Sequence, residues 1–153
     1  EHPITEMITG IDLVKLGIRV SAGETLPLSQ EEIQFSGHAI QCRLNAEDPI
    51  HFVPSPGKLW DCHFPGGKGV RVDTHAHIGY EMPGCFDSLL AKLIVCGQNR
   101  DEAIAKMKAA LAETTLIGVD TVIPLHQAIL DEPDFIARDV TIQYLEDHPN
   151  LLG

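Results

Sequence analysis

The clearest pattern of apolar and polar residues lies between positions 38 and 45. Two sets of side chains alternate along this stretch: His38, Ile40, Cys42 and Leu44 in one set, and Ala39, Gln41, Arg43 and Asn45 in the other. Such an alternation is typical of a strand that buries one face and exposes the other. The pattern therefore predicts a half-buried strand whose exposed face carries Arg43 between two amide side chains.

In the N-terminal segment, before this strand, apolar residues recur at the spacing of a helix. Pro3 disfavours a helical conformation for the residue before it, so residues 1–3 are expected to be extended. Ile11, Val14 and Ile18 recur at helical spacing, and Thr9 is a suitable N-cap for a helix that contains them. After a Pro-containing connector, residues 29–32 form a Ser-x-x-Glu capping box, which predicts one short turn.

The remaining chain alternates between short strands and helices. Strands are predicted over residues 58–64, 70–78 and 92–96, and Gly and Pro residues punctuate this part of the chain. A helix is predicted from Asp101, with Ile104, Met107 and Leu111 on its apolar face. Another is expected over residues 121–130, with Pro124 in its first turn, and a brief one near 142–145. These elements predict an α+β fold, a bent antiparallel sheet with packed helices.

Composition narrows the class of protein. The 153 residues are 44% hydrophobic with a mean hydropathy of +0.02, as expected for a soluble globular domain. A formal charge of −11 argues against nucleic acid or an anionic membrane as a partner. No apolar run approaches the roughly 18 residues of a membrane span, and no signal-peptide pattern is present. Four cysteines without a paired spacing suggest free thiols in a reducing compartment, hence the cytoplasm: Cys42, Cys62, Cys85 and Cys96.

Arg43 is the candidate binding residue. Its guanidinium is a rigid fork of donors suited to a planar anion, and Gln41 and Asn45 at positions i±2 add hydrogen-bonding groups on the same strand face. The simpler interpretation is a solvated strand face with an ordinary surface arginine.

Several ordered motifs together resemble the C-terminal part of biotin carboxylase. They are HAIQCRLNAEDP (38–49), PSPGK (54–58), GVRVDTH (69–75) and FDSLLAKLIV (86–95). The opening EHPITEMITGIDLV, residues 1–14, is similar to the close of that family's ATP-grasp domain. The resemblance implies an ATP-grasp tail with a strand end and helix at 1–34, the carboxylase C-terminal domain at 35–147, and a tail at 148–153. It also implies that the chain is a fragment whose nucleotide and magnesium ligands lie upstream.

The resemblance further implies a chemistry. Biotin carboxylases use ATP, Mg²⁺ and bicarbonate to carboxylate biotin that is borne on a carrier protein or domain. By resemblance Glu1 is the general base that takes the proton of bicarbonate, and Arg43 binds bicarbonate and stabilises the ureido oxyanion of biotin. Asp87, Gln41 and Asn45 are possible supporting residues, with Asp87 a candidate partner for an arginine. The module is common to acetyl-CoA, propionyl-CoA and pyruvate carboxylases, and the isolated chain is expected to be inactive.

The sequence departs from the family pattern at three places. Gln41 stands where the family commonly has Glu, and residues 83–88 read PGCFDS where the family usually has PPYYDS, so two tyrosine hydroxyls are lost. Bacterial members usually pair through the segment that contains Lys68 and Arg71, and the position of Lys68 is often apolar. Because a lysine near a two-fold axis meets its own copy, we expect at most a weak homodimer.

Two other functions are compatible with the residues. Asp73, His75 and His77 alternate like a metal-binding triplet, to which His51 or His63 could add a fourth ligand for a hydrolase-like site. Such triplets also arise by chance in a chain with eight histidines, so we expect no metal site. A non-catalytic assembly domain is the third possibility.

Overall fold

The computed structural model describes residues 2–152, and its helices and strands confirm the α+β class. In chain order the elements are α1 (Pro3–Thr9), α2 (Leu13–Ser21), the 3-10 helix η1 (Gln30–Glu32), β1 (His38–Asn45), β2 (Gly57–Lys58), β3 (Asp61–His63), β4 (Val70–Thr74), β5 (Glu81–Met82), β6 (Leu89–Gly97), α3 (Arg100–Glu113), β7 (Thr115–Ile117), α4 (Ile123–Asp131), α5 (Pro133–Ala137) and α6 (Tyr144–Asp147). None of the helices within residues 2–152 is both long and apolar enough to span a lipid bilayer.

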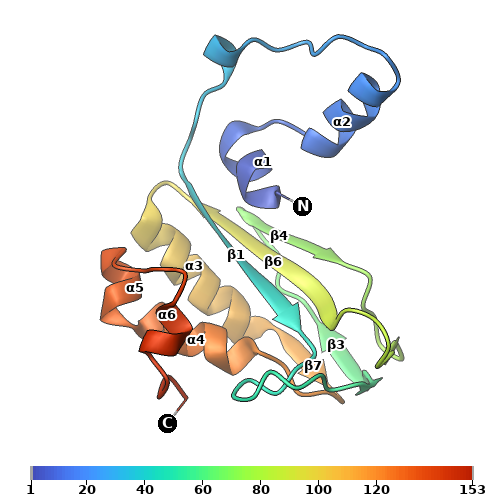
Figure 1. Ribbon diagram of the computed structural model, residues 1–153, viewed down its shortest axis with the longest axis vertical. Coiled ribbons are helices and arrows are strands. Elements are labelled where there is room, and N and C mark those ends of the chain that lie inside the picture. Colours follow the sequence, from blue (N-terminus) through green and yellow to red (C-terminus); the bar gives the residue numbers. More distant parts are fainter. Residues whose placement is uncertain (1, 153) are drawn as a thin grey trace.

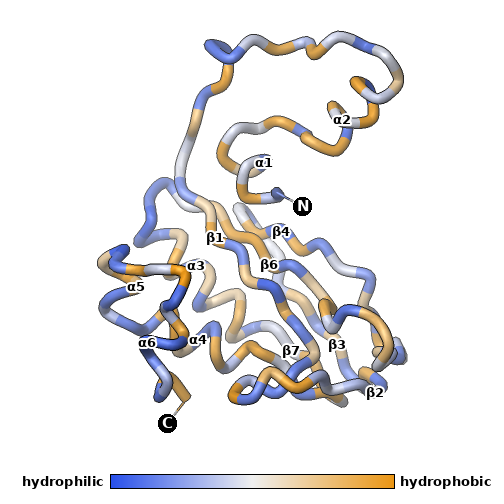
Figure 2. The backbone as a smooth tube through the Cα atoms, in the orientation of Figure 1, coloured by the Kyte–Doolittle hydropathy of each residue, from blue (hydrophilic) through white to orange (hydrophobic). Residues whose placement is uncertain are grey.

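An antiparallel sheet with the strand order β1-β6-β4 forms the centre of the molecule (Figure 1). The smaller pairs β2-β5 and β3-β7 lie at the end of this sheet to which the arrow of β1 points (Figure 1). Along β1 of this sheet, hydrophobic and hydrophilic residues alternate (Figure 2). The side chains of Ile40, Cys42 and Leu44 are buried and that of Arg43 is exposed, which confirms the alternation predicted from the sequence.

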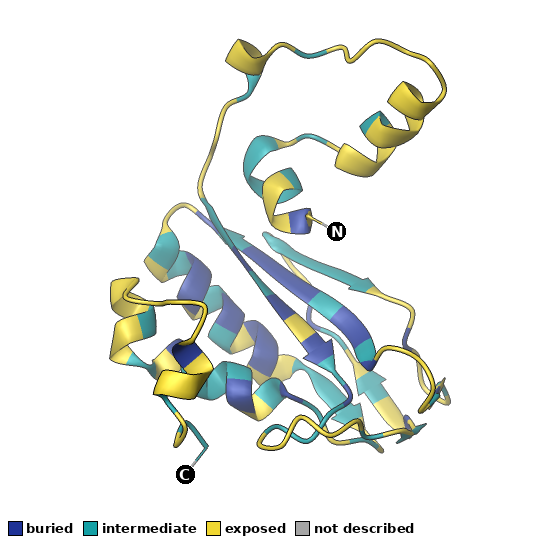
Figure 3. Cartoon of the chain, in the orientation of Figure 1, coloured by how far each residue is buried: buried dark blue, intermediate teal, exposed yellow. Residues whose placement is uncertain are grey.

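Helix α3 covers the apolar face of the sheet. Asn99 caps this helix, since its side chain accepts a hydrogen bond from the backbone N–H of Glu102. Buried residues of β1, β6 and α3 pack together in this core: Ile40, Cys42, Leu44, Ala91, Leu93, Val95, Ala103, Ile104, Met107, Ala110 and Leu111. The predicted apolar stripe of this helix is therefore confirmed, and most of β6 is buried (Figure 3).

Helix α1 packs on the opposite face of the sheet, against β1 and β6. Because Leu93 and Val95 face α3, the intervening Ile94 must face α1, and it is completely buried there. The strand β6 thus has helices on both faces. By contrast, α2 and the chain that follows it to η1 are mostly exposed (Figure 3).

The N-terminal helices begin where the sequence pattern did not place them. Pro3 occupies the first turn of α1, where the missing N–H of proline costs no hydrogen bond, and residues 3–9 are helical. Thr9 is the last residue of that helix, and its hydroxyl donates to the carbonyl of Thr5 at 2.6 Å. The predicted N-cap was wrong, because Asp12 caps α2 by accepting a hydrogen bond from the backbone N–H of Lys15.

Several strands are shorter than predicted. The segment 58–64 divides into β2 and β3, and β4 ends at Thr74, so the predicted strand over 70–78 was too long. The pairs β2-β5 and β3-β7 depend on short segments, 81–82 and 115–117, that the pattern left unassigned. Pro124 does lie in the first turn of α4, and the capping box at 29–32 is confirmed, with the N–H of Ser29 donating to Glu32 at 2.7 Å.

Candidate functional site

Arg43 lies in a row of charged residues that crosses the central sheet. In the register of the strands Arg43 stands opposite Lys92 of β6, and Lys92 stands opposite Asp73 of β4. Both oxygens of Asp73 accept hydrogen bonds from Arg71, each at 2.8 Å. Within residues 2–152 no ion pair joins Arg43 or Lys92 to a carboxylate. Two like charges directly opposite each other destabilise a sheet unless an anion lies between them, so this face is suited to bind one.

A polar network joins the ends of β1 and β6 beside this row. The Nδ2 group of Asn45 donates to Glu47 Oε1 and to Ser88 Oγ, each at 3.1 Å, and the Ser88 hydroxyl also donates to Glu47. Asn45 Oδ1 is buried and has no hydrogen-bond partner in the described part of the chain. The network therefore holds the strand end in place and leaves one acceptor free for a donor. The strand pattern alone did not single out Glu47 or Ser88, although both lie in the motifs that carry the resemblance.

The other supporting residues are less closely tied to Arg43. Asp87 is exposed, and its Oδ1 accepts a hydrogen bond from the backbone N–H of Leu89 at 2.8 Å. Among the described residues it makes no ion pair with an arginine, in contrast to the pairing considered from the sequence. Gln41 is half-buried and shares the strand face of Arg43. Glu1 lies outside the described residues.

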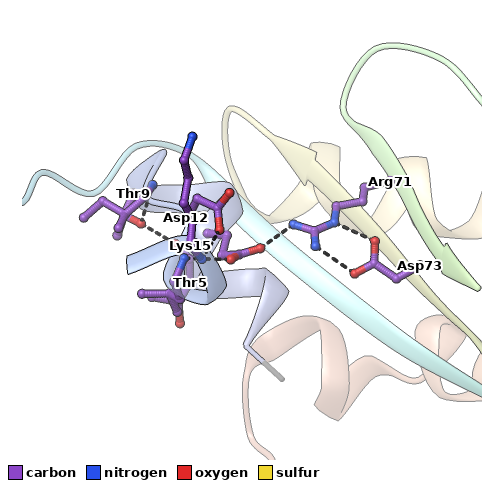
Figure 4. Close-up of polar contacts among 9 residues, drawn as sticks. Thr5, Thr9, Asp12, Lys15, Arg71 and Asp73 are labelled. Carbon is purple, nitrogen blue, oxygen red and sulfur yellow. Dashed lines mark hydrogen bonds and ion pairs between the residues drawn. The ribbon is translucent and has the colours of Figure 1, made fainter. Parts of the chain in front are cut away.

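The contact that holds α1 on this face is an ion pair. Glu6 of α1 binds Arg71 of β4 at 2.6 Å, and its other oxygen accepts a hydrogen bond from the backbone N–H of Leu13 at 2.9 Å. Figure 4 shows the guanidinium of Arg71 facing the carboxylate of Asp73 on one side and α1 on the other. The hydrogen bond from Arg71 and the one from Leu13 hold the pKa of Glu6 below its ordinary value. Hydrogen bonds to the carboxylates of Asp73 and Glu6 in turn raise the pKa of Arg71.

Lys68, the other residue expected at a contact between two copies of the domain, is exposed in the turn before β4. It lines a hollow of about 580 Å³ together with Lys106 and Glu102 of α3. Lys106 is already paired with Glu102 at 2.8 Å, and its Nζ also donates to the carbonyl of Cys96 at 2.9 Å. The two residues expected at the contact between copies of the domain thus lie in different environments. Arg71 is held by Glu6 and Asp73, whereas Lys68 faces solvent.

The triplet considered as a metal site does not come together as a cluster. Strand β4 ends before His75, so the alternation that would place Asp73, His75 and His77 on one face stops. Asp73 is held by Arg71, His75 Nε2 lies 3.2 Å from the Tyr80 hydroxyl, and His77 Nδ1 lies 2.9 Å from the carbonyl of Ile78. Residues 2–152 contain no group of three or more His, Cys, Asp or Glu side chains that could hold a metal ion.

Comparison with known protein families decides the family of this chain. The family model described as "Biotin carboxylase C-terminal domain" matches residues 41–147. The chain belongs to the biotin carboxylase family. A second family model, "Carbamoyl-phosphate synthase L chain, ATP binding domain", matches residues 1–29, which include α1 and α2. The match to the biotin carboxylase C-terminal domain confirms the resemblance that the sequence motifs indicated.

Individual relatives in this family agree with the match. The biotin carboxylase of Haemophilus influenzae is 51% identical over 146 residues, which are 95% of this chain and 33% of the relative. Biotin carboxylase 1 of Bacillus subtilis is 48% identical over 97% of this chain and 33% of its own length. The biotin carboxylase domain of Hydrogenobacter thermophilus 2-oxoglutarate carboxylase is a dimer in complex with MgADP, ADP and bicarbonate. It superimposes with a TM-score of 0.96 at 47% identity, over 100% of this chain and 34% of that one. The chain thus spans about a third of the length of these biotin carboxylases.

Proposed function

We propose that this chain supplies Arg43 to a biotin carboxylase, a ligase that uses ATP and bicarbonate to carboxylate biotin on a carrier protein. The observation that carries the proposal is that two cations, Arg43 and Lys92, stand opposite each other without an ion pair in the described residues, on the sheet face on which α1 packs. The bicarbonate in the 2-oxoglutarate carboxylase structure supports an anion as the ligand of such a site. The remaining two thirds of the length of the relatives would hold ATP and Mg²⁺.

In the proposed mechanism Glu1 and Arg43 have separate tasks. Glu1 accepts the proton of bicarbonate, which makes the bicarbonate oxygen nucleophilic. Arg43 donates hydrogen bonds to the negative charge that develops on the ureido oxygen of biotin when the ureido nitrogen loses its proton. Lys92 adds a second positive charge next to Arg43, and the Asn45 network keeps the strand end from moving. Gln41 and Asp87 would adjust the polarity around the guanidinium.

Replacement of Arg43 by Ala in the complete protein tests this function. We expect carboxylation of free or carrier-borne biotin to fall roughly 100-fold or more, the loss typical of a donor that stabilises an oxyanion. The melting temperature should change little, because the Arg43 side chain is exposed. Arg138→Asn is the control, since it removes another exposed guanidinium at a left-handed position that Asn tolerates. An Arg43→Ala protein with near-normal turnover would remove this residue from the site. Glu1→Gln should reduce carboxylation comparably.

The isolated chain is expected to be inactive. We retain the division into an ATP-grasp tail at residues 1–34, the carboxylase domain at 35–147 and a tail at 148–153, which puts the nucleotide site in the upstream part of the protein. The free thiols support a cytoplasmic location. Calorimetry of the 153-residue chain with ATP should show no saturable binding, and binding in the micromolar range would contradict the division.

A weak homodimer is the assembly that we propose for this domain. Lys68 is exposed, and a two-fold axis near it would bring two ammonium groups together. Lys68→Leu should therefore tighten association in sedimentation experiments. A wild-type chain that stays dimeric at nanomolar concentration would show that Lys68 lies outside the contact.

A further inference from the structure

Strand β1 lies at the edge of the central sheet, and its free edge is bound by α4. Its only strand neighbour in the described sheet is β6, so alternate backbone groups of β1 point away from the ladder. Two of the outward carbonyls, those of Arg43 and Asn45, are two residues apart, as expected for one strand edge. Both accept hydrogen bonds from the same short stretch, residues 122–126. Figure 1 shows α4 beside the end of β1.

The two bonds have different donors. The backbone N–H of Val122, the N-cap of α4, donates to the Asn45 carbonyl at 3.3 Å. One turn later, Nε2 of His126 lies 2.8 Å from the Arg43 carbonyl oxygen. A carbonyl oxygen can only accept, so the imidazole must carry its proton on Nε2. A side chain thus takes the place of a neighbouring strand at the position that bears the proposed catalytic guanidinium.

His126 is well suited to a permanent bond of this kind. Its side chain is half-buried, and burial lowers its pKa, although the bond to Arg43 acts in the opposite direction. The imidazole is therefore neutral at neutral pH, and it adds no positive charge beside Arg43 and Lys92. Val122 and Leu125 are buried, which anchors the first turn of α4 independently of the imidazole.

We propose that His126 is a positioning residue for Arg43, which it acts on through the backbone carbonyl of that residue. The inference rests on the proposed role of Arg43 in biotin carboxylation. Without the imidazole N–H the Arg43 carbonyl loses its partner on the free edge, and the Val122 bond is then the one hydrogen bond left between residues 122–126 and that edge in the described part of the chain. A shift of the β1 backbone at Arg43 also moves the guanidinium that is attached to it. Displacement of a catalytic group by about 1 Å can reduce a rate up to roughly 100-fold.

The test compares three substitutions of His126 in the complete protein. His126→Leu fills a similar space without a donor. His126→Gln places an amide N–H near the position of Nε2, whereas His126→Asn is one bond shorter and places its amide near the position of Nδ1. Gln127→Leu, at the next position of α4, is the control, because Gln127 makes no hydrogen bond with β1 in the part of the chain described.

We expect kcat for biotin carboxylation to fall roughly tenfold or more in His126→Leu and His126→Asn and to recover most of this loss in His126→Gln. The effect should vanish in an Arg43→Ala background, since His126 acts through Arg43. Comparable kcat values for the Leu, Gln and wild-type proteins would overturn the proposal. So would an equal loss from His126→Leu with and without Arg43, because that result indicates a general structural role.

The proposal and the function on which it rests fail in different ways. If Arg43→Ala retains near-normal turnover, the catalytic role of Arg43 is wrong and the positioning role falls with it. If Arg43→Ala is inactive but His126→Leu is fully active, only the positioning role is wrong. Should His126→Leu not fold, the comparison of His126→Asn with His126→Gln decides the same question.

Discussion

The ion pair between Glu6 and Arg71 should be the main polar contact that holds α1 on the central sheet. Arg71→Met removes the guanidinium and keeps most of the aliphatic stem. The Glu6 side chain is only 14% exposed and that of Arg71 is 36% exposed. After the substitution Glu6 keeps one hydrogen bond, from the backbone N–H of Leu13, and otherwise lies largely buried without a cation. The Asp73 side chain is more exposed than that of Glu6 and can be rehydrated. The loss of its hydrogen bonds from Arg71 should therefore cost little free energy of unfolding.

The magnitude follows from these exposures. Hydrogen bonds to charged groups contribute about 1.5–3 kcal/mol each when they are shielded, and removal of one partner leaves the other unsatisfied. Because Arg71 is about one-third exposed, we expect Arg71→Met to cost about 2 kcal/mol in the free energy of unfolding. Urea titration of the chain should show this as a fall in the midpoint of about 1 M. A double-mutant cycle with Glu6→Gln should give a coupling free energy of about 1 kcal/mol.

The exposed ion pair Arg19–Glu24 is a matched control for the pair Glu6–Arg71. It has the same N–O distance, 2.6 Å, but its side chains are 43% and 50% exposed, so Arg19→Met should cost less than about 0.5 kcal/mol. The pH dependence of the free energy of unfolding is a second measurement of the Glu6–Arg71 pair. The pKa of Glu6 lies below its ordinary value of 4.5 when the chain is folded. Its contribution to stability is therefore complete above pH 4.5 and is lost as the pH falls through the folded-state pKa. Equal costs for the two substitutions, or a coupling below about 0.3 kcal/mol, would refute the reasoning.

Two further predictions concern the backbone and the core. Gly118 has φ = +120°, and a Cβ atom there would lie 1.9 Å from the carbonyl oxygen of Lys58, so Gly118→Ala should cost about 3 kcal/mol or more in urea titrations. Gly10→Ala, with a positive φ but no atom within 4 Å of the added Cβ, should cost only about 1 kcal/mol, and similar costs at both sites would contradict the close approach. Leu93→Ala should lower the free energy of unfolding by about 2–5 kcal/mol because Leu93 is completely buried, whereas exposed Leu26→Ala should change it by less than about 0.5 kcal/mol. Equal melting temperatures for the two leucine variants would show that Leu93 does not lie in the core.

The strands and helices that the sequence predicts correctly are those with a long periodic pattern. The alternation over residues 38–45 and the apolar stripe of α3 both extend over enough residues to distinguish a period of two from one of 3.6. The N-terminal helices were harder, because Thr9 and Asp12 are both suitable N-caps within four residues. A pattern alone cannot decide whether Pro3 ends an extended segment or begins a helix.

The candidate site shows a similar division. Arg43 could be identified from its own strand, since its exposure follows from the local alternation. Lys92 and His126 could not, because their places beside Arg43 depend on which distant segments pair and on how α4 meets an edge strand. Strand β6 also reads as a continuous apolar run, so its length was underestimated. Only the position of α1 explains why both of its faces are buried.

The position of β6 also has a consequence for folding kinetics. This strand has a neighbour on each side, but β4 and α3 are near it in the chain, whereas residues 46–88 separate it from β1. Contacts of short sequence separation require less loop-closure entropy, so β4, β6 and α3 are expected to form the folding nucleus. The strand that carries Arg43 would dock after the transition state. Substitutions along β1 should therefore accelerate unfolding far more than they slow folding.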